Sequence, residues 1–541
     1  MHRLDTDESA PFMGLDPDDP EVTGITSTRI HDLHDVEEGI GGDNGLPYTS
    51  YRERRKEAQR MQISYNVTSV LNRQQFVITL ARALITYGAP SHRIESQLIS
   101  ASRILEIDAE FIHLPNIVLV SFEGTESKAH IAHFLSCSGR LALGRLEDVH
   151  RLYRSVVHDE ICAKTGTEQL INLIKAPPIY GTKTRCLLAF MLSALICPLA
   201  FGGSFVDMWI AGFGALMLCA LQLKVAGKSS LKSNVFEITI AIGISFLARG
   251  LSSIRVDFFC YSAISSAGIV GILPGYLILS SALELASKNI LTGSVRMVYA
   301  LIYTLFLGIG LQIGSDLYLL FDTGERLLLK DIASSSQRMI IYTGMFIADN
   351  ATAVGNGIPP TGTFAYSNNT IRTQEHFVDG CYRPADFPWY LQPFPFWTQF
   401  VIVPAFSILS SLANLQPWRK FVLIVMVLIS CASYAANKAA NHYIFNRSDV
   451  VSAIGAFVVG LLGNIYSRKF GGTAFTVMVT GALFLVPSGL SQAGGITASG
   501  NGIDIGSAMI AVSVGITIGL FMSQAIVYLF GTKKNAAVFS F

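Results

Sequence analysis

The chain has 541 residues, of which 50% are hydrophobic and 15% are charged, and its mean hydropathy is +0.44. Soluble domains carry about 25% charged residues, so this composition excludes an ordinary soluble protein and indicates an integral membrane protein. The net charge of +1, without a basic tract, gives no reason to expect nucleic acid, and eight cysteines without a CxxC pair predict neither a disulfide framework nor a metal site.

Residues 1–62 predict a disordered acidic tail. Twelve acidic residues lie between Asp5 and Asp43, and few large apolar residues are available to offset the entropy of ordering the chain. A solvated tail is the main interpretation, and a regulatory or docking segment is the alternative.

Residues 63–183 predict a small cytoplasmic α+β domain. Apolar residues recur at helical spacing, and short β-branched runs flank a turn at Pro115 and Asn116. The expected elements are helices over 69–87 and 95–105, strands within 109–124 and 128–136, and one helix over 146–164.

The two helices before the strands are joined by an elbow, "YGAPSHRIES", at 87–96. Gly88 suits a residue with positive φ, and Glu95 lies near the positive end of the following helix. His92 and Glu95 are three residues apart on one helical face, with Arg93 between them, so they could form a base and its partner or half a metal site, but no third ligand is evident. The main interpretation is a structural joint or regulatory contact that positions a cytoplasmic cap beneath the membrane domain; ligand sensing and catalysis are the alternatives.

From residue 184 onward the chain predicts ten membrane-spanning helices. Five lie in 184–313 and five in 395–541, separated by a long polar stretch at 314–394. The apolar segments are 186–203, 205–223, 235–252, 258–279, 291–313, 396–414, 420–438, 449–466, 471–491 and 507–530.

Charge in the short loops predicts the orientation of these helices. Fourteen lysines and arginines, from Lys175 to Lys534, lie at one set of ends, and four lie at the other. Positive residues are retained on the cytoplasmic side, so both termini are expected in the cytoplasm. The long stretch, with the glycosylation acceptors Asn350 and Asn368, is then expected to be non-cytoplasmic.

An internal repeat relates the two sets of helices. Pro274 and Pro487 are 213 residues apart, and so are Gly268 and Gly481, Leu277 and Leu490, Ile290 and Ile503, Gly293 and Gly506, and Ser294 and Ser507. Because each half has five spans, the second copy would insert upside down. Two inverted five-helix repeats are typical of secondary transporters, whose sites form where the repeats meet.

Two kinds of residue in these helices are candidates for binding. Pro274 with Gly275, and Pro487 with Gly489, interrupt spans at matching places and free backbone groups that could bind a zwitterion; plain kinks are the alternative. The other candidates are ionisable, and a charge inside a membrane is a functional hypothesis by default. Glu237 and Glu284 could couple protons or bind an ammonium group, and Arg296 could bind a carboxylate, unless Glu284 and Arg296 lie at the interface.

Four segments, "GAPSHRIES", "APPIYG", "LPGYLILSSALEL" and "GSVRMVYAL", together resemble the threonine/serine exporter (ThrE) family, and within it the fungal branch called pheromone-regulated membrane protein. The resemblance covers about 65–530. It implies a ten-helix membrane domain of two related halves behind a cytoplasmic domain. It also implies export of small hydroxylated amino acids driven by the membrane potential or a proton gradient, an activity of the bacterial members. The acidic tail and the 314–394 stretch depart from that pattern.

The function expected from the sequence is therefore a secondary transporter for small polar amino acids, not an enzyme, with the lipid bilayer, the amino acid and protons as partners and no cofactor. The alternatives are a membrane sensor that does not transport and a membrane-anchored hydrolase using His92 and Glu95. A plasma membrane and a vacuolar membrane fit equally well, and the sequence leaves a homo-oligomer open.

Overall fold

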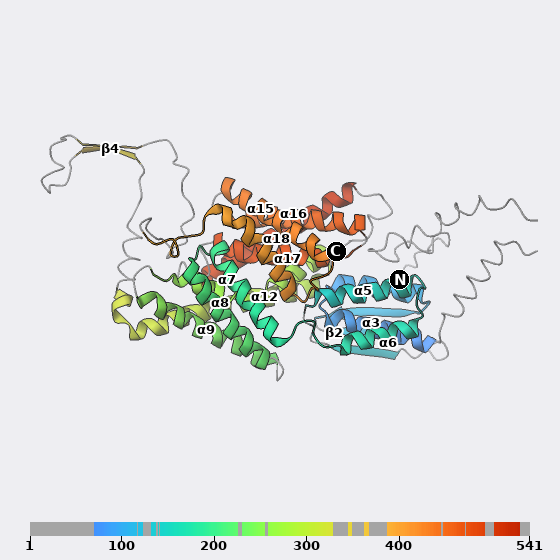
Figure 1. Ribbon diagram of the computed structural model, residues 1–541. Helices are drawn as coiled ribbons and strands as arrows, with labels where there is room; N and C mark the ends of the chain where they lie inside the picture. Colours follow the sequence, from blue (N-terminus) through green and yellow to red (C-terminus); the bar gives the residue numbers. More distant parts are fainter. Residues whose placement is uncertain are drawn as a thin grey trace, which may run out of the picture.

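The computed structural model describes residues 70–115, 117–122, 131–136, 139, 141–225, 230–254, 258–327, 344–348, 362–366, 387–444, 447–470, 472–492 and 502–530. The predicted acidic tail and the acceptors Asn350 and Asn368 lie outside these residues. Figure 1 shows an N-terminal domain at one end of the molecule, a bundle of long helices in the middle, and the hairpin of β4 (Gly344–Ala348) and β5 (Gly362–Tyr366) at the opposite end.

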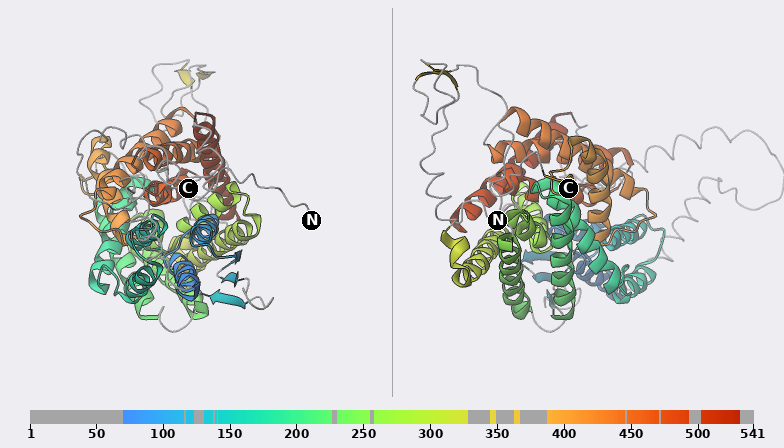
Figure 2. Two further views of the ribbon diagram at one scale, coloured as in Figure 1. Left: turned by 90° about the vertical axis from the view of Figure 1, so that its right-hand side faces the viewer. Right: turned by 60° about the vertical axis from the view of Figure 1, so that its left-hand side comes forward.

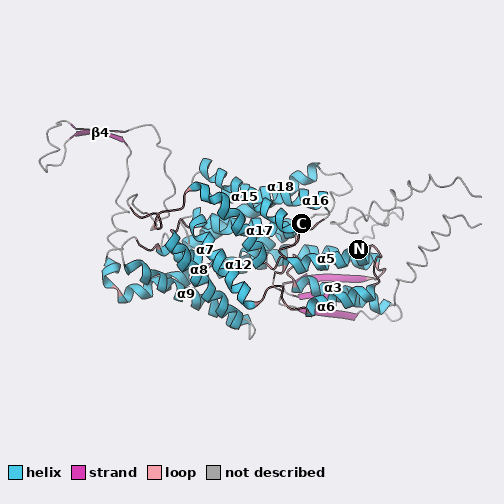
Figure 3. Ribbon diagram, in the orientation of Figure 1, coloured by secondary structure: helices cyan, strands magenta, loops and turns pink. Residues whose placement is uncertain are grey.

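The N-terminal domain places a three-stranded sheet beside four helices. The strands β1 (Ala109–Leu114), β2 (Ile117–Phe122) and β3 (Ile131–Ser136) are antiparallel in the order β1-β2-β3, and Leu114 pairs with Ile117 across the turn that the sequence predicts. Figure 3 shows that this sheet and the distant hairpin hold the strands of the described chain. The helices are α3 (Val70–Thr86), α4 (Ser91–Ile104), α5 (Leu143–Val157) and α6 (Ala163–Lys175).

One prediction for this domain is wrong: the helix expected over 146–164 is two helices. α5 ends at Val157, and Asp159 adopts a φ of +59°, a left-handed conformation in which helices commonly end. α6 then begins after Cys162. The apolar spacing continues across the break, which is why the sequence pattern alone did not show it.

The first half of the membrane domain contains a broken helix. Its continuous helices are α7 (Thr182–Ala200), α8 (Phe205–Val225), α9 (Ser230–Ile254) and α12 (Ile290–Phe321). The predicted span 258–279 is instead α10 (Tyr261–Gly268), the short helix η1 (Val270–Ile272) and α11 (Gly275–Ala286), bent by 59° at the break. α12 also runs eight residues past its predicted end at 313, into the stretch expected to be a loop.

The second half consists of η3 (Phe396–Thr398), α14 (Gln399–Ala413), α15 (Val422–Tyr443), α16 (Ser448–Phe470), α17 (Ala474–Gln492) and α18 (Gly502–Phe530). Within the described residues, eight helices are long and apolar enough to cross a membrane, and the bent pair would add a ninth. Ala474–Pro487 of α17 is a shorter apolar stretch. All ten predicted apolar segments thus overlap helices.

Both halves use the same device to pack their last helix. Gly310 and Gly314 of α12 lie against α9, and Gly515 and Gly519 of α18 lie against α16. A Cβ at Gly314 would lie 2.3 Å from the carbonyl oxygen of Ile242 and one at Gly519 would lie 2.2 Å from that of Ala453, so both pairs of backbones approach as closely as glycine allows. The small-xxx-small spacing therefore recurs in both halves.

The two halves lie side by side and meet along the helices that follow the break. α11 packs against α17 and α18, and α12 packs against α18. Figure 2 shows the same arrangement from two other sides, with the green helices of the first half on one side and the orange and red helices of the second half on the other. Close to this seam, Cys260 before α10 is disulfide-bonded, an exception to the pattern expected for the cysteines.

Candidate functional site

The break in the first half lies against the second half. Pro274 is the N-cap of α11 and Gly275 is its first residue. A Cβ at Gly275 would lie 2.9 Å from Leu483 Cδ2 and 3.8 Å from Val486 Cγ2 of α17, one residue before Pro487. The structure therefore brings the two predicted Pro-Gly segments together at the seam, although Pro487 lies inside a continuous helix. Gly489 also lies in α17, and its surroundings are outside the described residues.

Glu284 lies two residues before the end of α11 and is fully buried. Arg296 of α12 forms an ion pair with its Oε1. The same oxygen accepts hydrogen bonds from two atoms of Ser91, the first residue of α4: the backbone N–H at 3.0 Å and the hydroxyl at 2.6 Å. Glu284 therefore caps a helix that belongs to the N-terminal domain, where the positive end of the helix favours a carboxylate.

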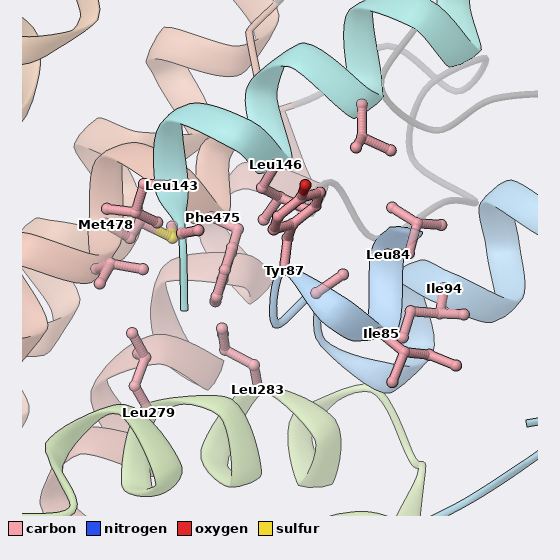
Figure 4. Packing of buried hydrophobic residues seen from close by; sticks show 14 of the residues in the cluster. Leu84, Ile85, Tyr87, Ile94, Leu143, Leu146, Leu279, Leu283, Phe475 and Met478 are labelled. Carbon is pink, nitrogen blue, oxygen red and sulfur yellow. The ribbon is translucent and has the colours of Figure 1, made fainter. Parts of the chain in front are cut away.

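The elbow that precedes Ser91 follows α11 along its length. Gly88 has a φ of +76°, as the sequence predicts, and its carbonyl accepts a 2.6 Å hydrogen bond from the hydroxyl of Tyr276 at the start of α11. At the other end, the side-chain amide of Asn289 lies 3.5 Å from Glu95 Oε2. Figure 4 shows the apolar side of this junction, where Tyr87 and residues of α3 and α4 approach side chains of α5, α11 and α17.

Arg296 also affects a histidine of the sheet. Burial and the guanidinium of Arg296 lower the pKa of His113 in β1 to about 4. His113 is thus neutral at physiological pH, beside a cation that is paired with Glu284. The side chains of three elements, α11, α12 and β1, meet at this point of the junction.

The remaining polar residues of the elbow do not assemble with a metal. Arg93 is buried, with 3% of its surface exposed, and His92 follows Ser91 in the first turn of α4. Within the described residues, no group of three or more histidine, cysteine, aspartate or glutamate side chains could hold a metal ion. Glu95 approaches Asn289 across the junction.

Glu237 lies in a separate position of the first half. It is 8% exposed and accepts hydrogen bonds from the hydroxyl of Tyr303 on α12 and from the side-chain amide of Gln222 on α8, the latter at 2.7 Å. This carboxylate is therefore held among three membrane helices, away from the elbow. Glu237 and Glu284 thus have different surroundings, the first among α8, α9 and α12 and the second where α4, α11 and α12 meet.

A second junction ties the N-terminal domain to the other half. Lys420, between α14 and α15, lies 2.8 Å from Asp148 Oδ1 and 3.2 Å from Glu147 Oε2 of α5. The backbone N–H of Leu143 donates to the carbonyl of Asn414 at 3.0 Å. The domain is thus attached to both halves at once.

Sequence reasoning missed five partners of the candidate residues: Ser91, Gln222, Tyr276, Asn289 and Tyr303. Ser91 and Tyr276 lie inside the motifs "GAPSHRIES" and "LPGYL", which the sequence analysis singled out. The contact between Ser91 and Glu284 could not be predicted, because the two residues are 193 positions apart in the chain.

Part of this chain matches a known protein family. Residues 75–318 match the family model described as "Putative threonine/serine exporter". Over these residues the chain is similar to that exporter family. The match covers the elbow, the broken helix, Glu237, Glu284 and Arg296, and it ends before the second half.

Curated relatives match more of the chain. Proteins called "Pheromone-regulated membrane protein 10" are 33% identical over 98% of this chain in Debaryomyces hansenii, 90% in Pichia sorbitophila and 87% in Saccharomyces cerevisiae. The chain covers 50%, 45% and 56% of these relatives, so it spans about half their length. No solved structure matches the chain. With its apolar helices, the chain is a multi-pass membrane protein that is similar to the exporter family and has relatives in fungi.

Proposed function

We propose that the protein is a secondary transporter that exports small polar amino acids of the threonine and serine type by alternating access. The observation that carries the proposal is the bent span whose second segment contains, near its end, a fully buried glutamate paired with an arginine. Ionisable groups inside a membrane domain are costly and mark substrate or ion pathways. The family match supports the class of substrate.

In this proposal, the pair recognises both ends of an amino acid. Arg296 binds the carboxylate, and Glu284 binds the ammonium group. The break at Pro274 and Gly275 lets α11 change its angle to α10, and its contact with α17 transmits that change across the seam. Ten spans in two inverted repeats, with both termini and the N-terminal domain in the cytoplasm, complete the arrangement.

We assign proton coupling to Glu237. The sequence favours Glu284 for this role, with Glu237 as the alternative if Glu284 proves interfacial. Glu284 lies at the junction with the N-terminal domain and is engaged by Arg296 and Ser91, so it serves recognition. Glu237 is held within the membrane helices, and the hydroxyl of Tyr303 gives it a partner through which a proton can pass.

Purified protein in liposomes tests both assignments. We expect labelled threonine and serine to undergo counterflow and to accumulate when a pH gradient is imposed. Glu237→Gln should keep counterflow and lose gradient-driven accumulation. Glu284→Gln should weaken both by tenfold or more, since a charged hydrogen-bond partner contributes about 1.5–3 kcal/mol. Glu325→Gln serves as the matched carboxylate control, because Glu325 lies beyond the end of α12.

Two outcomes would contradict the assignments. Gradient-driven accumulation by both Glu237→Gln and Glu284→Gln at the rate of the unchanged protein would remove both carboxylates from the mechanism. Absence of counterflow in the unchanged protein would show that it does not transport these amino acids.

The contact between the N-terminal domain and both halves favours a second candidate, a membrane sensor. In that case the unchanged protein binds threonine or serine without moving it across the bilayer. A hydrolase is not proposed, because Glu95 is directed to Asn289.

A further inference from the structure

Ser91 offers two donors to one carboxylate oxygen. Its backbone N–H and its hydroxyl both bind Glu284 Oε1, at 3.0 and 2.6 Å, and both residues are fully buried. The two donors are joined through Cα and Cβ of one residue. The group bound by Glu284 is therefore an N–Cα–Cβ–O unit.

Free serine and threonine contain the same unit, with an ammonium group in place of the peptide N–H. We propose that Ser91 is an internal mimic of a β-hydroxy-α-amino acid, and that Glu284 is the site where such a free amino acid replaces it. The proposal rests on the proposed function, and it specifies the β-hydroxyl as the group by which the site selects its substrate.

A second observation indicates that the site is incompletely filled by Ser91. Glu284 Oε2 is buried and has no hydrogen-bond partner among the described residues, and neither does Thr292 Oγ1 on the first turn of α12. A peptide N–H supplies one proton, whereas an ammonium group supplies three. A free amino acid can therefore satisfy the acceptor that Ser91 leaves unpaired, which favours the exchange because an unpaired buried acceptor costs about 1–3 kcal/mol.

Exchange at Glu284 would weaken the attachment of the broken helix to the N-terminal domain. The elbow is held on α11 by Ser91 in the middle, by the Tyr276–Gly88 hydrogen bond at one end and by Asn289 and Glu95 at the other, and exchange removes the buried middle contact. The Lys420–Asp148 junction lies on the second half and is independent of Glu284. Substrate arrival would thus loosen the elbow on α11 while the domain remains attached to the other half.

Hydrogen–deuterium exchange of the full chain in lipid nanodiscs tests this inference. The reporter is the amide exchange of residues 87–94, with serine, threonine or 2-aminobutyrate added; the last resembles threonine without the hydroxyl. We expect serine and threonine to speed exchange at the elbow, and 2-aminobutyrate to need a concentration at least about tenfold higher, as for loss of one hydrogen bond to a charged group.

Three variants distinguish the effect of the Ser91 hydroxyl from a general loosening of the elbow. Ser91→Ala should raise basal exchange at the elbow about tenfold and lower the concentration of serine that saturates it. Ser91→Thr keeps the N–Cα–Cβ–O unit and should respond as the unchanged protein does. Ser96→Ala removes another hydroxyl of the same helix, one that donates to the carbonyl of Arg93 and not to Glu284. Amide exchange at the elbow in this variant should therefore equal that of the unchanged protein.

Counterflow measured on the same preparation distinguishes the two claims. If threonine undergoes counterflow but elbow exchange is unchanged by serine and threonine, the mimic is wrong and transport stands. If elbow exchange responds selectively to β-hydroxy amino acids without counterflow, the binding site stands and the transport proposal fails. Equal responses to threonine and 2-aminobutyrate, or equal exchange in Ser91→Ala and Ser96→Ala, would overturn the inference.

Discussion

Glu284 and Arg296 show how a charge is kept in an apolar protein interior. The carboxylate is fully buried, and its ion pair and the N–H of Ser91 replace the water that it would otherwise bind. Such a pair contributes little compared with an apolar pair of the same shape, but removing one partner leaves an uncompensated buried charge. The sequence predicts the pair as two candidates, and what it could not show is that the third member comes from another domain.

Replacing Arg296 alone should therefore destabilise the protein more than replacing both charges. We expect Arg296→Met to lower the free energy of unfolding by about 3 kcal/mol, and Arg296→Met with Glu284→Gln to recover most of the loss. Denaturant titration in detergent measures both. Arg151→Met is the control, because its pair with Glu147 is exposed and should contribute less than about 0.5 kcal/mol. Equal losses in the single and double variants would show that the charges are not coupled.

His113 gives the junction a pH dependence. Its pKa falls from 6.5 to about 4 on folding, so between these values the unfolded chain takes up a proton that the folded protein does not. Stability should be complete above about pH 6.5 and decline as the pH falls towards 4, by up to about 1.4 kcal/mol per pH unit. His113→Gln should flatten the decline, and His133→Gln on β3 should not. Unfolding curves from pH 7.5 to 5 measure the slope, and identical slopes in both variants would refute the role of His113.

Among the elements, α11 contacts the first half, the second half and the N-terminal domain. It begins at the break, packs on α17 and α18, and carries the partners of the elbow. The sequence identifies its Pro-Gly start because proline and glycine have defined backbone effects, and it identifies the three strands because their alternation and turn residues are local. The sequence also predicts an interruption at Pro274 and Gly275, where the helix bends by 59°. The extension of α11 from the predicted end at 279 to Ala286 and the division of 146–164 into two helices were missed, since both preserve the apolar spacing on which the prediction relies.

The elbow depends on a glycine at its first turn. Gly88→Ala would place a Cβ 3.1 Å from the Tyr276 hydroxyl oxygen and 3.3 Å from Leu141 Cα, at a φ of +76° that side chains other than glycine rarely adopt. We expect a loss of about 1–3 kcal/mol in unfolding free energy and faster amide exchange at 87–94. Gly181→Ala is the matched control, with open space around the added carbon. If both variants match the unchanged protein, the elbow is not held in the way described.

Across the whole molecule, the N-terminal domain connects two halves that are also joined along the seam of α11, α12, α17 and α18 and where α7 packs on α14. One junction is at Glu284 in the first half, and the other is at Lys420 in the second. A transporter that alternates its access moves its halves relative to each other, so a domain bound to both must release one of them. The sequence predicts this domain and the two halves, but contacts between residues so far apart in the chain leave no local pattern.

The most direct measurement is threonine counterflow in proteoliposomes that contain Glu95→Cys/Asn289→Cys, before and after reduction. The side-chain tips of Glu95 and Asn289 lie 3.5 Å apart across the elbow junction, so a reducible cross-linker of matching length between the two cysteines fastens the elbow to the end of α11. Asp148→Cys/Lys420→Cys, at the second junction, and the unchanged protein treated with the same cross-linker are the controls. We predict that the cross-linked protein does not exchange threonine and that reduction restores counterflow to the rate of the unchanged protein. Equal counterflow in the fully cross-linked and the reduced protein would contradict it.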